Sequence, residues 1–343
     1  MTTLIRTCAT ATLLLGLSAP AIAQQSGSAA PSSYPAVTFG TQSFLQYAAE
    51  LVDEQHQNAF DVTRGYLNIQ ARLSPRVRFR FTPDVRPTTD ASLTTNLTLR
   101  LEYAQLEADV SDRGSVLFGM HETPWLAFEQ SINRYRVQGT MFAERQGLIP
   151  GQTDLGASFR RRGERAEVHV GVYNGEGYGR AELDRYKSVQ GRVSYTVLAD
   201  DIAGSNVRLS GFYSHGWYAR DRPRNLAIIM GSYEHPNVVA TAQYVMSKDN
   251  PFVAQDIDRR GTSLFGEVRQ GPTGWAGLAR VDFYDPDRSN ASDSTHRYIF
   301  GGAHWSQLGQ GRFGVVISLD QRFRSANADR LETRLLAQTH VEF

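Results

Sequence analysis

Apolar and polar residues alternate in short segments that recur from residue 36 to the last residue of the chain. In the segment 76–86, for example, Val77, Phe79 and Phe81 alternate with Arg76, Arg78 and Arg80. Because neighbouring side chains of a β-strand point to opposite faces, this period of two predicts strands with one apolar and one polar face. The pattern predicts about sixteen strands, and an even number is typical of bacterial outer-membrane barrels. We expect them at about 36–47, 60–73, 76–86, 94–110, 114–122, 153–162, 165–174, 187–198, 205–218, 224–234, 237–247, 260–270, 273–284, 294–306, 311–322 and 332–343.

The connections between these predicted strands alternate between short and long. Ser74-Pro75 and the segment 111–114 are tight turns, whereas 48–59 and 123–152 are long connections. A membrane barrel has short periplasmic turns at one end and longer loops at the other, and a soluble sandwich has no reason to sort its loops in this way. The sequence therefore predicts an all-β fold, a transmembrane antiparallel β-barrel of about sixteen strands.

The two ends of the chain indicate export to the bacterial outer membrane. Residues 1–23 have the features of a cleaved secretory leader, namely the basic Arg6, a short apolar run and a small-residue cleavage site. Residues 24–34 are rich in Gln, Ser and Ala and predict a flexible lead, so the barrel is expected to occupy 35–343. Phe343 ends the last alternating strand, and we expect the barrel-assembly machinery to recognise this terminal aromatic residue.

The aromatic residues suggest where the barrel meets the membrane interfaces. Tyr66, Tyr103, Tyr213, Trp217 and Trp275 lie near predicted strand ends, where aromatic side chains form girdles at the membrane surfaces. Some of these residues could instead pack across neighbouring strands.

The composition argues against several classes of function. The chain has 36 Lys and Arg against 35 Asp and Glu, and removing Arg6 with the leader leaves 35 of each sign, so a nucleic-acid partner is not indicated. The histidines are scattered without a nucleophile motif, so we expect no enzyme and no cofactor. The acidic segment 285–293 lacks the spacing of a known calcium loop, which favours a solvated loop and no metal site.

A barrel of this strand number leaves an aqueous channel. The longest connection, 123–152, is the third external one, and its centre can form one or two helical turns. We expect this loop to fold into the lumen and narrow it. The candidate constriction residues are Glu129, Arg134, Arg136, Glu144 and Arg145. These residues could also form ion pairs that pin the loop to the wall, and both roles are compatible.

Arginines on the polar faces of the strands are candidates for the channel lining. Arginine stays charged and its planar fork matches the oxygens of phosphate, so such a lining would concentrate anions. Acids such as Glu102 and Asp282 alternate into the same lumen, so a mixed wall without anion preference is the alternative. The predicted lumen arginines are Arg78, Arg80, Arg100, Arg192, Arg208, Arg280 and Arg322.

Several motifs follow one another in a fixed order between about 115 and 200: Thr123-Pro-Trp125, Arg134-Tyr-Arg136, the segment 138–147, Thr153-Asp-Leu-Gly156 and the segment 171–177. In their order and spacing these motifs resemble the phosphate-selective porin O/P family. The resemblance implies a trimeric porin of sixteen strands that contacts outer-membrane lipid and passes small hydrophilic solutes, preferably anions, through an arginine-lined lumen. Two alternatives stay open: a general diffusion porin without anion selectivity, and a structural barrel or adhesin with an occluded lumen.

Overall fold

The computed structural model describes residues 33–52, 55–88, 96–180, 182, 185–199, 204–219, 221–251, 256–326 and 329–343. The barrel is the compact unit Tyr34–Phe343. The predicted leader, 1–23, and nearly all of the predicted lead, 24–34, lie outside the described residues. No helix in the described part of the chain is both long enough and apolar enough to cross a membrane.

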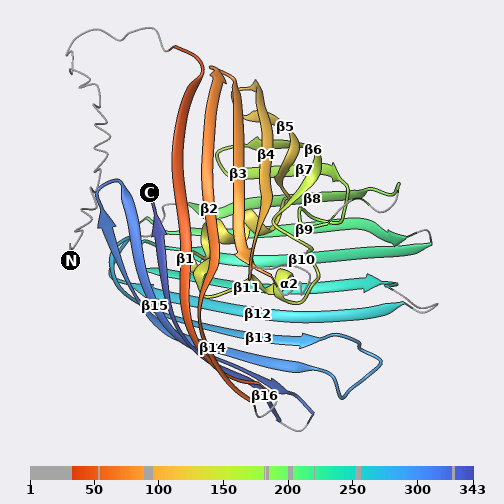
Figure 1. The fold of residues 1–343 in the computed structure, drawn as a ribbon. Helices are drawn as coiled ribbons and strands as arrows, with labels where there is room; N and C mark the ends of the chain where they lie inside the picture. The colour runs from red at the N-terminus through yellow and green to blue at the C-terminus, as the bar shows by residue number, and fades with distance from the viewer. Residues whose placement is uncertain are drawn as a thin grey trace, which may run out of the picture. The chain divides into compact units, whose positions relative to one another are not determined.

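Sixteen antiparallel strands form a closed barrel in which each strand pairs with its neighbours in sequence (Figure 1). The predicted strand positions are confirmed, most of them to within about two residues. The strands are β1 (Ala36–Val52), β2 (Gln55–Ser74), β3 (Val77–Pro87), β4 (Leu97–Ser111), β5 (Gly114–Glu122), β6 (Thr153–Arg162), β7 (Ala166–Tyr173), β8 (Ser188–Ala199), β9 (Asn206–Ala219), β10 (Arg222–Glu234), β11 (Val238–Asp249), β12 (Ile257–Arg269), β13 (Gly274–Asp285), β14 (Thr295–Leu308), β15 (Gly311–Arg324) and β16 (Arg330–Glu342).

The barrel closes between its first and last strands. β1 pairs with β16 from Gln42 opposite Glu342 to Val52 opposite Glu332. Beyond this ladder, Phe343 exchanges two backbone hydrogen bonds with Thr41, with N···O distances of 2.7 and 3.1 Å. The terminal residue therefore completes the seam, and its ring lies on the outer face with 71% of its surface exposed.

The prediction of a first external loop at 48–59 is wrong. β1 continues to Val52, β2 begins at Gln55, and Val52 lies opposite Gln55 in the ladder. Residues 55–58 are Gln, His, Gln and Asn, so this part of β2 has no apolar face for sequence periodicity to detect. Backbone pairing alone extends this hairpin, because a two-stranded ladder needs no buried face to satisfy its hydrogen bonds.

The outer and inner faces of the barrel follow the predicted alternation in most strands. Leu99, Val172 and Val193 are exposed on the outside, with 69%, 48% and 55% of their surface accessible, as lipid-facing residues should be. Tyr213 and Trp275 are also exposed, in agreement with a girdle.

Tyr66 and Tyr103 depart from the predicted girdle. Both line a cavity inside the barrel, and Tyr103 is only 3% exposed. Trp217 is half-buried against His215 and Tyr186. A break in the alternation of β4, described below, explains the position of Tyr103.

The long connection after β5 folds inside the ring of strands, as predicted (Figure 1). It contains α1 (Leu126–Ile132), the short 3₁₀ helix η1 (Tyr135–Val137) and α2 (Phe142–Arg145). Its apolar side chains form one buried cluster with Phe44 of β1 and with inward-facing residues of β9 to β15. We call this surface of the inner wall the loop seat; its residues include Phe212, Leu226, Ile228, Met230, Phe265, Ile299 and Trp305.

The loop seat was not predicted, because β10 is apolar on both faces. Leu226, Ile228 and Met230 are buried inside, while Ile229 is 53% exposed outside. A strand that is apolar on both sides shows no alternation, so its inner face cannot be distinguished from its lipid face by pattern alone. The loop therefore fills one arc of the lumen and leaves the arc of β1 to β4 and β16, which is largely polar apart from residues such as Phe44 and Leu336.

Candidate functional site

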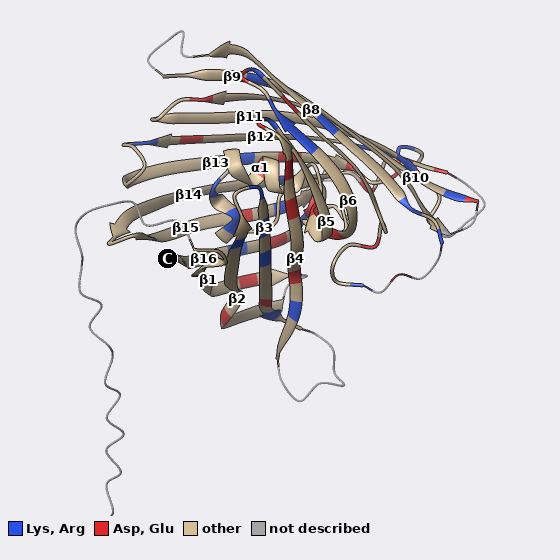
Figure 2. Cartoon of the chain, turned by 90° about the horizontal axis from the view of Figure 1, so that it is seen from above, with Lys and Arg blue, Asp and Glu red and all other residues tan. Residues whose placement is uncertain are grey.

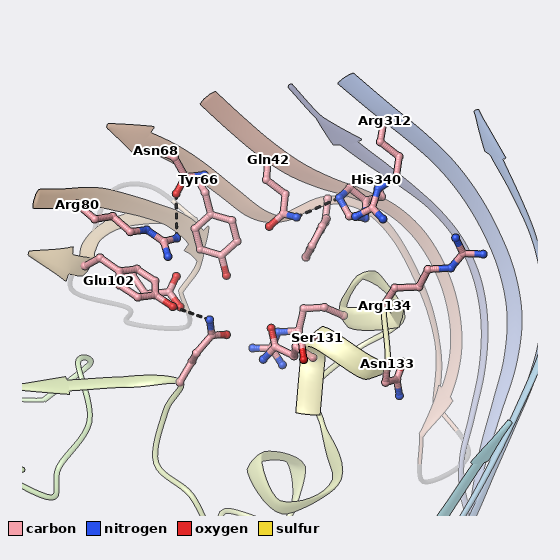
Figure 3. Close-up of a pocket in the computed structure, with 15 residues that line it drawn as sticks. Gln42, Tyr66, Asn68, Arg80, Glu102, Ser131, Asn133, Arg134, Arg312 and His340 are labelled. Atoms are coloured by element: carbon pink, nitrogen blue, oxygen red, sulfur yellow. Dashed lines mark hydrogen bonds between the residues drawn. The ribbon is translucent and has the colours of Figure 1, made fainter. Parts of the chain in front are cut away.

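One of the spaces that the loop leaves open is a cavity of about 320 Å³ between α1, η1 and the polar arc (Figure 3). We call it the eyelet cavity. Among the described residues its lining contains four arginines and a single carboxylate, together with amides, phenols and a histidine. The lining residues are Gln42, Phe44, Tyr66, Asn68, Arg80, Glu102, Tyr103, Gln130, Ser131, Asn133, Arg134, Arg136, Gln152, Arg312 and His340.

A β-bulge places two consecutive residues of β4 in this lining. In the pairing with β3, Thr82 lies opposite Tyr103 and Pro83 lies opposite Leu101, so Glu102 is the extra residue. Pro83 has no N–H to donate to the ladder, which favours an irregularity at this point. As a result Glu102 and Tyr103 both face the lumen, with 2% and 3% of their surface exposed. Bulges redirect side chains in this way beside functional sites.

Arg80 is held in a fixed orientation at the eyelet. Its guanidinium carbon lies 3.5 Å from the centre of the Tyr103 ring. Its Nε donates to Thr82 Oγ1 at 3.1 Å, and a terminal nitrogen donates to Asn68 Oδ1 at 3.0 Å. No carboxylate of the described residues lies within 4 Å of this guanidinium, so its charge is not neutralised by a direct ion pair.

The other arginines of the eyelet have carboxylate partners on the side away from the cavity. Arg134 donates to the buried Glu267 at 2.6 Å and to the carbonyl oxygen of Pro272 at 3.0 Å. Arg136 pairs with Glu144 at 2.5 Å within the loop, and Arg312 pairs with Glu342 at 2.8 Å.

The five predicted loop residues divide into two groups. Arg134 and Arg136 reach the eyelet lining, whereas Glu129, Glu144 and Arg145 do not. Glu129 accepts hydrogen bonds from Trp125 Nε1 at 3.0 Å and from Gln243 Nε2 of the wall at 2.7 Å.

The three residues outside the lining attach the loop or stabilise it internally. Arg145 lies 3.9 Å from Asp320 of the wall. Burial of Glu129 raises the pKa of its carboxyl group to about 6.

The seven predicted wall arginines all lie on strands, and most are paired with acids. Arg78 makes two contacts of 2.6 Å with Asp109 and one of 3.1 Å with Glu107. Figure 2 shows acidic and basic positions interspersed along β2, β3 and β4. The other pairs are Arg192 with Glu167, Arg208 with Glu234, Arg280 with Asp282 and Arg322 with Glu332. Arg80 alone of the seven reaches the eyelet lining, and Arg100 lies beside Gly179 of the connection after β7.

That connection also reaches the inner wall. The hydroxyl of Tyr178 accepts hydrogen bonds from Arg64 at 2.9 Å and Arg86 at 3.0 Å, and it donates to Asp84 at 3.1 Å. A second loop is therefore fixed to β2 and β3 by one phenol.

Sequence reasoning did not assign several eyelet residues to the site. Gln42, Asn68, Arg312 and His340 come together because the last strand pairs with the first, which no local pattern reveals. The available signal was Pro83, since a proline inside a strand indicates an edge or a bulge.

Comparisons with known proteins identify the fold. No family model matches the sequence, so the resemblance to the phosphate-selective family is not confirmed. No curated protein matches it either.

Three solved structures illustrate the likeness. The anion-selective porin from Comamonas acidovorans superposes with a TM-score of 0.64 and 13% identity, over 90% of this chain and 99% of that one. A loop-deletion mutant of OmpT, an outer membrane protein of Vibrio cholerae, gives 0.63 and 10%, over 91% and 100%. Salmonella typhi OmpF in complex with daunomycin gives 0.62 and 10%, over 90% and 98%. The chain has the closed sixteen-stranded barrel fold of bacterial outer-membrane porins.

Proposed function

We propose that this protein is an outer-membrane porin, a water-filled channel for the passive diffusion of small hydrophilic solutes with a preference for anions. The observation that carries the proposal is the eyelet cavity, which combines an internal loop, a polar arc and four arginines around one carboxylate. A narrow polar passage in a wall of low dielectric constant selects ions by the sign of the charges that line it.

The arrangement of the ion pairs supports a moderate preference for anions. The carboxylate partners of Arg134 and Arg136 lie on the side away from the cavity, since Glu267 and Glu144 do not line it. Each pair therefore presents its positive end to a passing solute. Weak, distributed sites of this kind release an ion as readily as they bind it, which conduction requires.

Phosphate belongs to the proposed solutes as one anion among several. The guanidinium fork matches phosphate oxygens, but most wall arginines already use that fork on carboxylates. A general diffusion porin without selectivity is the alternative if the paired charges cancel. One observation favours a structural barrel with an occluded lumen. The internal loop packs on the apolar loop seat and fills the arc of the lumen opposite the polar arc.

We further propose that residues 1–23 are a secretory leader and that the chain assembles in the outer membrane through the strand ending at Phe343. A homotrimer is supported by one structural neighbour, the in-vitro folded trimer form of Vibrio cholerae OmpT, with a TM-score of 0.59 and 9% identity. No enzymatic activity is proposed for this barrel.

The test is the conductance of the purified protein in planar bilayers, with heat-denatured protein as the control. Stepwise current increments are expected, and their absence would establish the occluded barrel instead. Under a KCl gradient the reversal potential should have the sign of chloride preference. A potential near zero would indicate a general diffusion porin, and block of chloride current by phosphate would measure the affinity for phosphate.

A further inference from the structure

The eyelet cavity contains polar atoms that have no hydrogen-bond partner in the described structure. Glu102 Oε2, Gln130 Nε2 and His340 Nδ1 are all buried and unpaired. Glu102 and His340 are each only 2% exposed, so the protein buries these groups in the cavity wall and leaves part of their bonding capacity open. Buried polar groups are normally satisfied, and each exception calls for a water or a ligand.

Glu102 has an unmet requirement for a hydrogen-bond donor. Burial and the neighbouring Asp84 oppose the charge of its carboxylate, whereas Arg64, Arg136 and Arg80 attract it. None of them donates a hydrogen bond to it, and one of its oxygens has no donor at all. A solute ammonium group would meet the field of three guanidinium groups, whereas a neutral hydroxyl would supply the missing hydrogen bond without that repulsion.

Gln130 has the complementary requirement. Its side-chain amide nitrogen lacks an acceptor, and it lines the same cavity. A hydroxyl group both donates and accepts, so a solute with several hydroxyls can satisfy Glu102 and Gln130 together. The amides of Asn68 and Gln152 extend this lining, and Figure 3 shows Tyr66 pointing into the cavity, where its ring offers an apolar surface.

The same cavity holds a place for a negative charge. Arg80 is stacked on Tyr103 and fixed by two hydrogen bonds, which leaves one terminal nitrogen without a contact in the described structure. Arg312 lies across the seam on β15, with its guanidinium carbon 5.1 Å from the Trp305 ring centre. The volume of about 320 Å³ is at the lower end of the range for small-molecule sites, about 300–1,000 Å³.

We propose that the eyelet cavity binds polyhydroxylated organic anions of the sugar-acid type, with the carboxylate on Arg80 and the hydroxyls on Glu102 and Gln130. This inference rests on the proposed porin function for the route by which the solute enters. It goes beyond anion preference, because it separates solutes of equal charge by their hydroxyl groups.

The experiment compares three solutes as blockers of chloride current through the wild-type protein in planar bilayers. Gluconate carries a carboxylate and a chain of hydroxyls, hexanoate has the same number of carbons without hydroxyls, and sorbitol has hydroxyls without charge. Gluconate should block at about a tenfold lower concentration than hexanoate, the difference that one or two added hydrogen bonds make. Sorbitol should block least. Inorganic phosphate is the fourth solute, and block by phosphate as strong as by gluconate would show that charge alone is recognised.

Two variants test whether Glu102 and Gln130 recognise the hydroxyl groups of the solute. Glu102→Gln removes a negative charge and strengthens the binding of every anion, so the readout is the ratio of the hexanoate and gluconate half-blocking concentrations. Gln130→Met removes the amide without changing charge. Each should lower the ratio about threefold, the loss of about one hydrogen bond. Gln146 lies on the same loop outside the eyelet lining, so the control variant Gln146→Met should leave the ratio unchanged.

A wild-type ratio near one, or a ratio that neither variant changes, would overturn the inference while leaving the porin intact. Titration calorimetry of the detergent-solubilised protein with gluconate and hexanoate measures the same ratio without any current. If the protein binds gluconate preferentially but does not conduct, the porin proposal fails and the binding site stands.

Discussion

Replacing Arg80 by Gln should reduce the anion preference of the channel more cleanly than any other single change. Arg80 is the eyelet arginine without a carboxylate within 4 Å in the described part of the chain, so its removal leaves no newly unpaired acid behind. Gln can keep a hydrogen bond to Asn68, whose Oδ1 accepts from Arg80 at 3.0 Å. The variant therefore changes the charge of the passage with little change in its shape.

The size of the effect follows from Coulomb's law. A unit charge about 5 Å from a passing ion in water changes the energy of that ion by about 0.8 kcal/mol. Screening at 0.1 M salt, with a Debye length of about 10 Å, reduces this to about 0.5 kcal/mol. Chloride loses this stabilisation and potassium gains it, so the ratio of their permeabilities should fall by about fivefold.

The assay is the reversal potential under a KCl gradient, repeated at higher salt, where screening should weaken the shift. The matched control is the double variant Arg136→Gln with Glu144→Gln, which removes one charge of each sign from a pair joined at 2.5 Å. Because the net charge is unchanged, its reversal potential should shift much less than that of Arg80→Gln. An unchanged potential in Arg80→Gln, or an equal shift in the neutral double variant, would refute the electrostatic reasoning.

Three further outcomes are expected. Glu267→Gln leaves Arg134 and Arg269 without their buried carboxylate, so the barrel should lose about 3–5 kcal/mol of stability in urea unfolding, and an unchanged midpoint would show that the pair does not hold the loop. Because burial raises the pKa of Glu129 to about 6 from 4.5, the folded state binds the extra proton, and this group should lower stability by about 2 kcal/mol as pH rises through that window. In unfolding measured from pH 4 to 7, Glu129→Gln should reduce the loss of stability by that amount, and an unchanged pH dependence would contradict the reasoning. Tyr178→Phe removes hydroxyl contacts with Arg64 and Arg86, so limited trypsin digestion should cleave after Arg180 about tenfold faster, while an unchanged reversal potential would confirm that the eyelet is intact.

Most strands of the barrel could be located from the sequence, because apolar and polar residues must alternate in a strand with one face in lipid and the other in water. β5 and β6 begin and end where the pattern places them, at 114–122 and 153–162. The pattern failed where that physical condition is relaxed. Residues 55–58 of the hairpin are polar on both faces, so the pattern missed the start of β2. β10 was located, but its inner face is apolar because the loop replaces water there, so the pattern could not tell the two faces apart.

The candidate site was less predictable than the fold. The loop and its arginines could be located from length and charge, but the partners of those arginines depend on register across strands. Arg78 meets Asp109 on the neighbouring strand, and Arg134 meets Glu267 on the far wall. The bulge at Glu102 shifts the alternation of β4 by one residue, so any reading that continues the period past Leu101 places Tyr103 on the wrong face.

The lumen is divided into a loop seat and a polar arc, and substitutions in these two regions have different consequences. Substitutions in β9 to β15 that disturb Leu226, Ile228 or Trp305 change how the loop is held, and they should be selected mainly for assembly. Substitutions at inward positions of β1 to β4 face solute directly and can vary without unseating the loop. Barrels of this design can therefore acquire new solute preferences by substitutions in the first third of the chain, while β9 to β15 keep the loop in place.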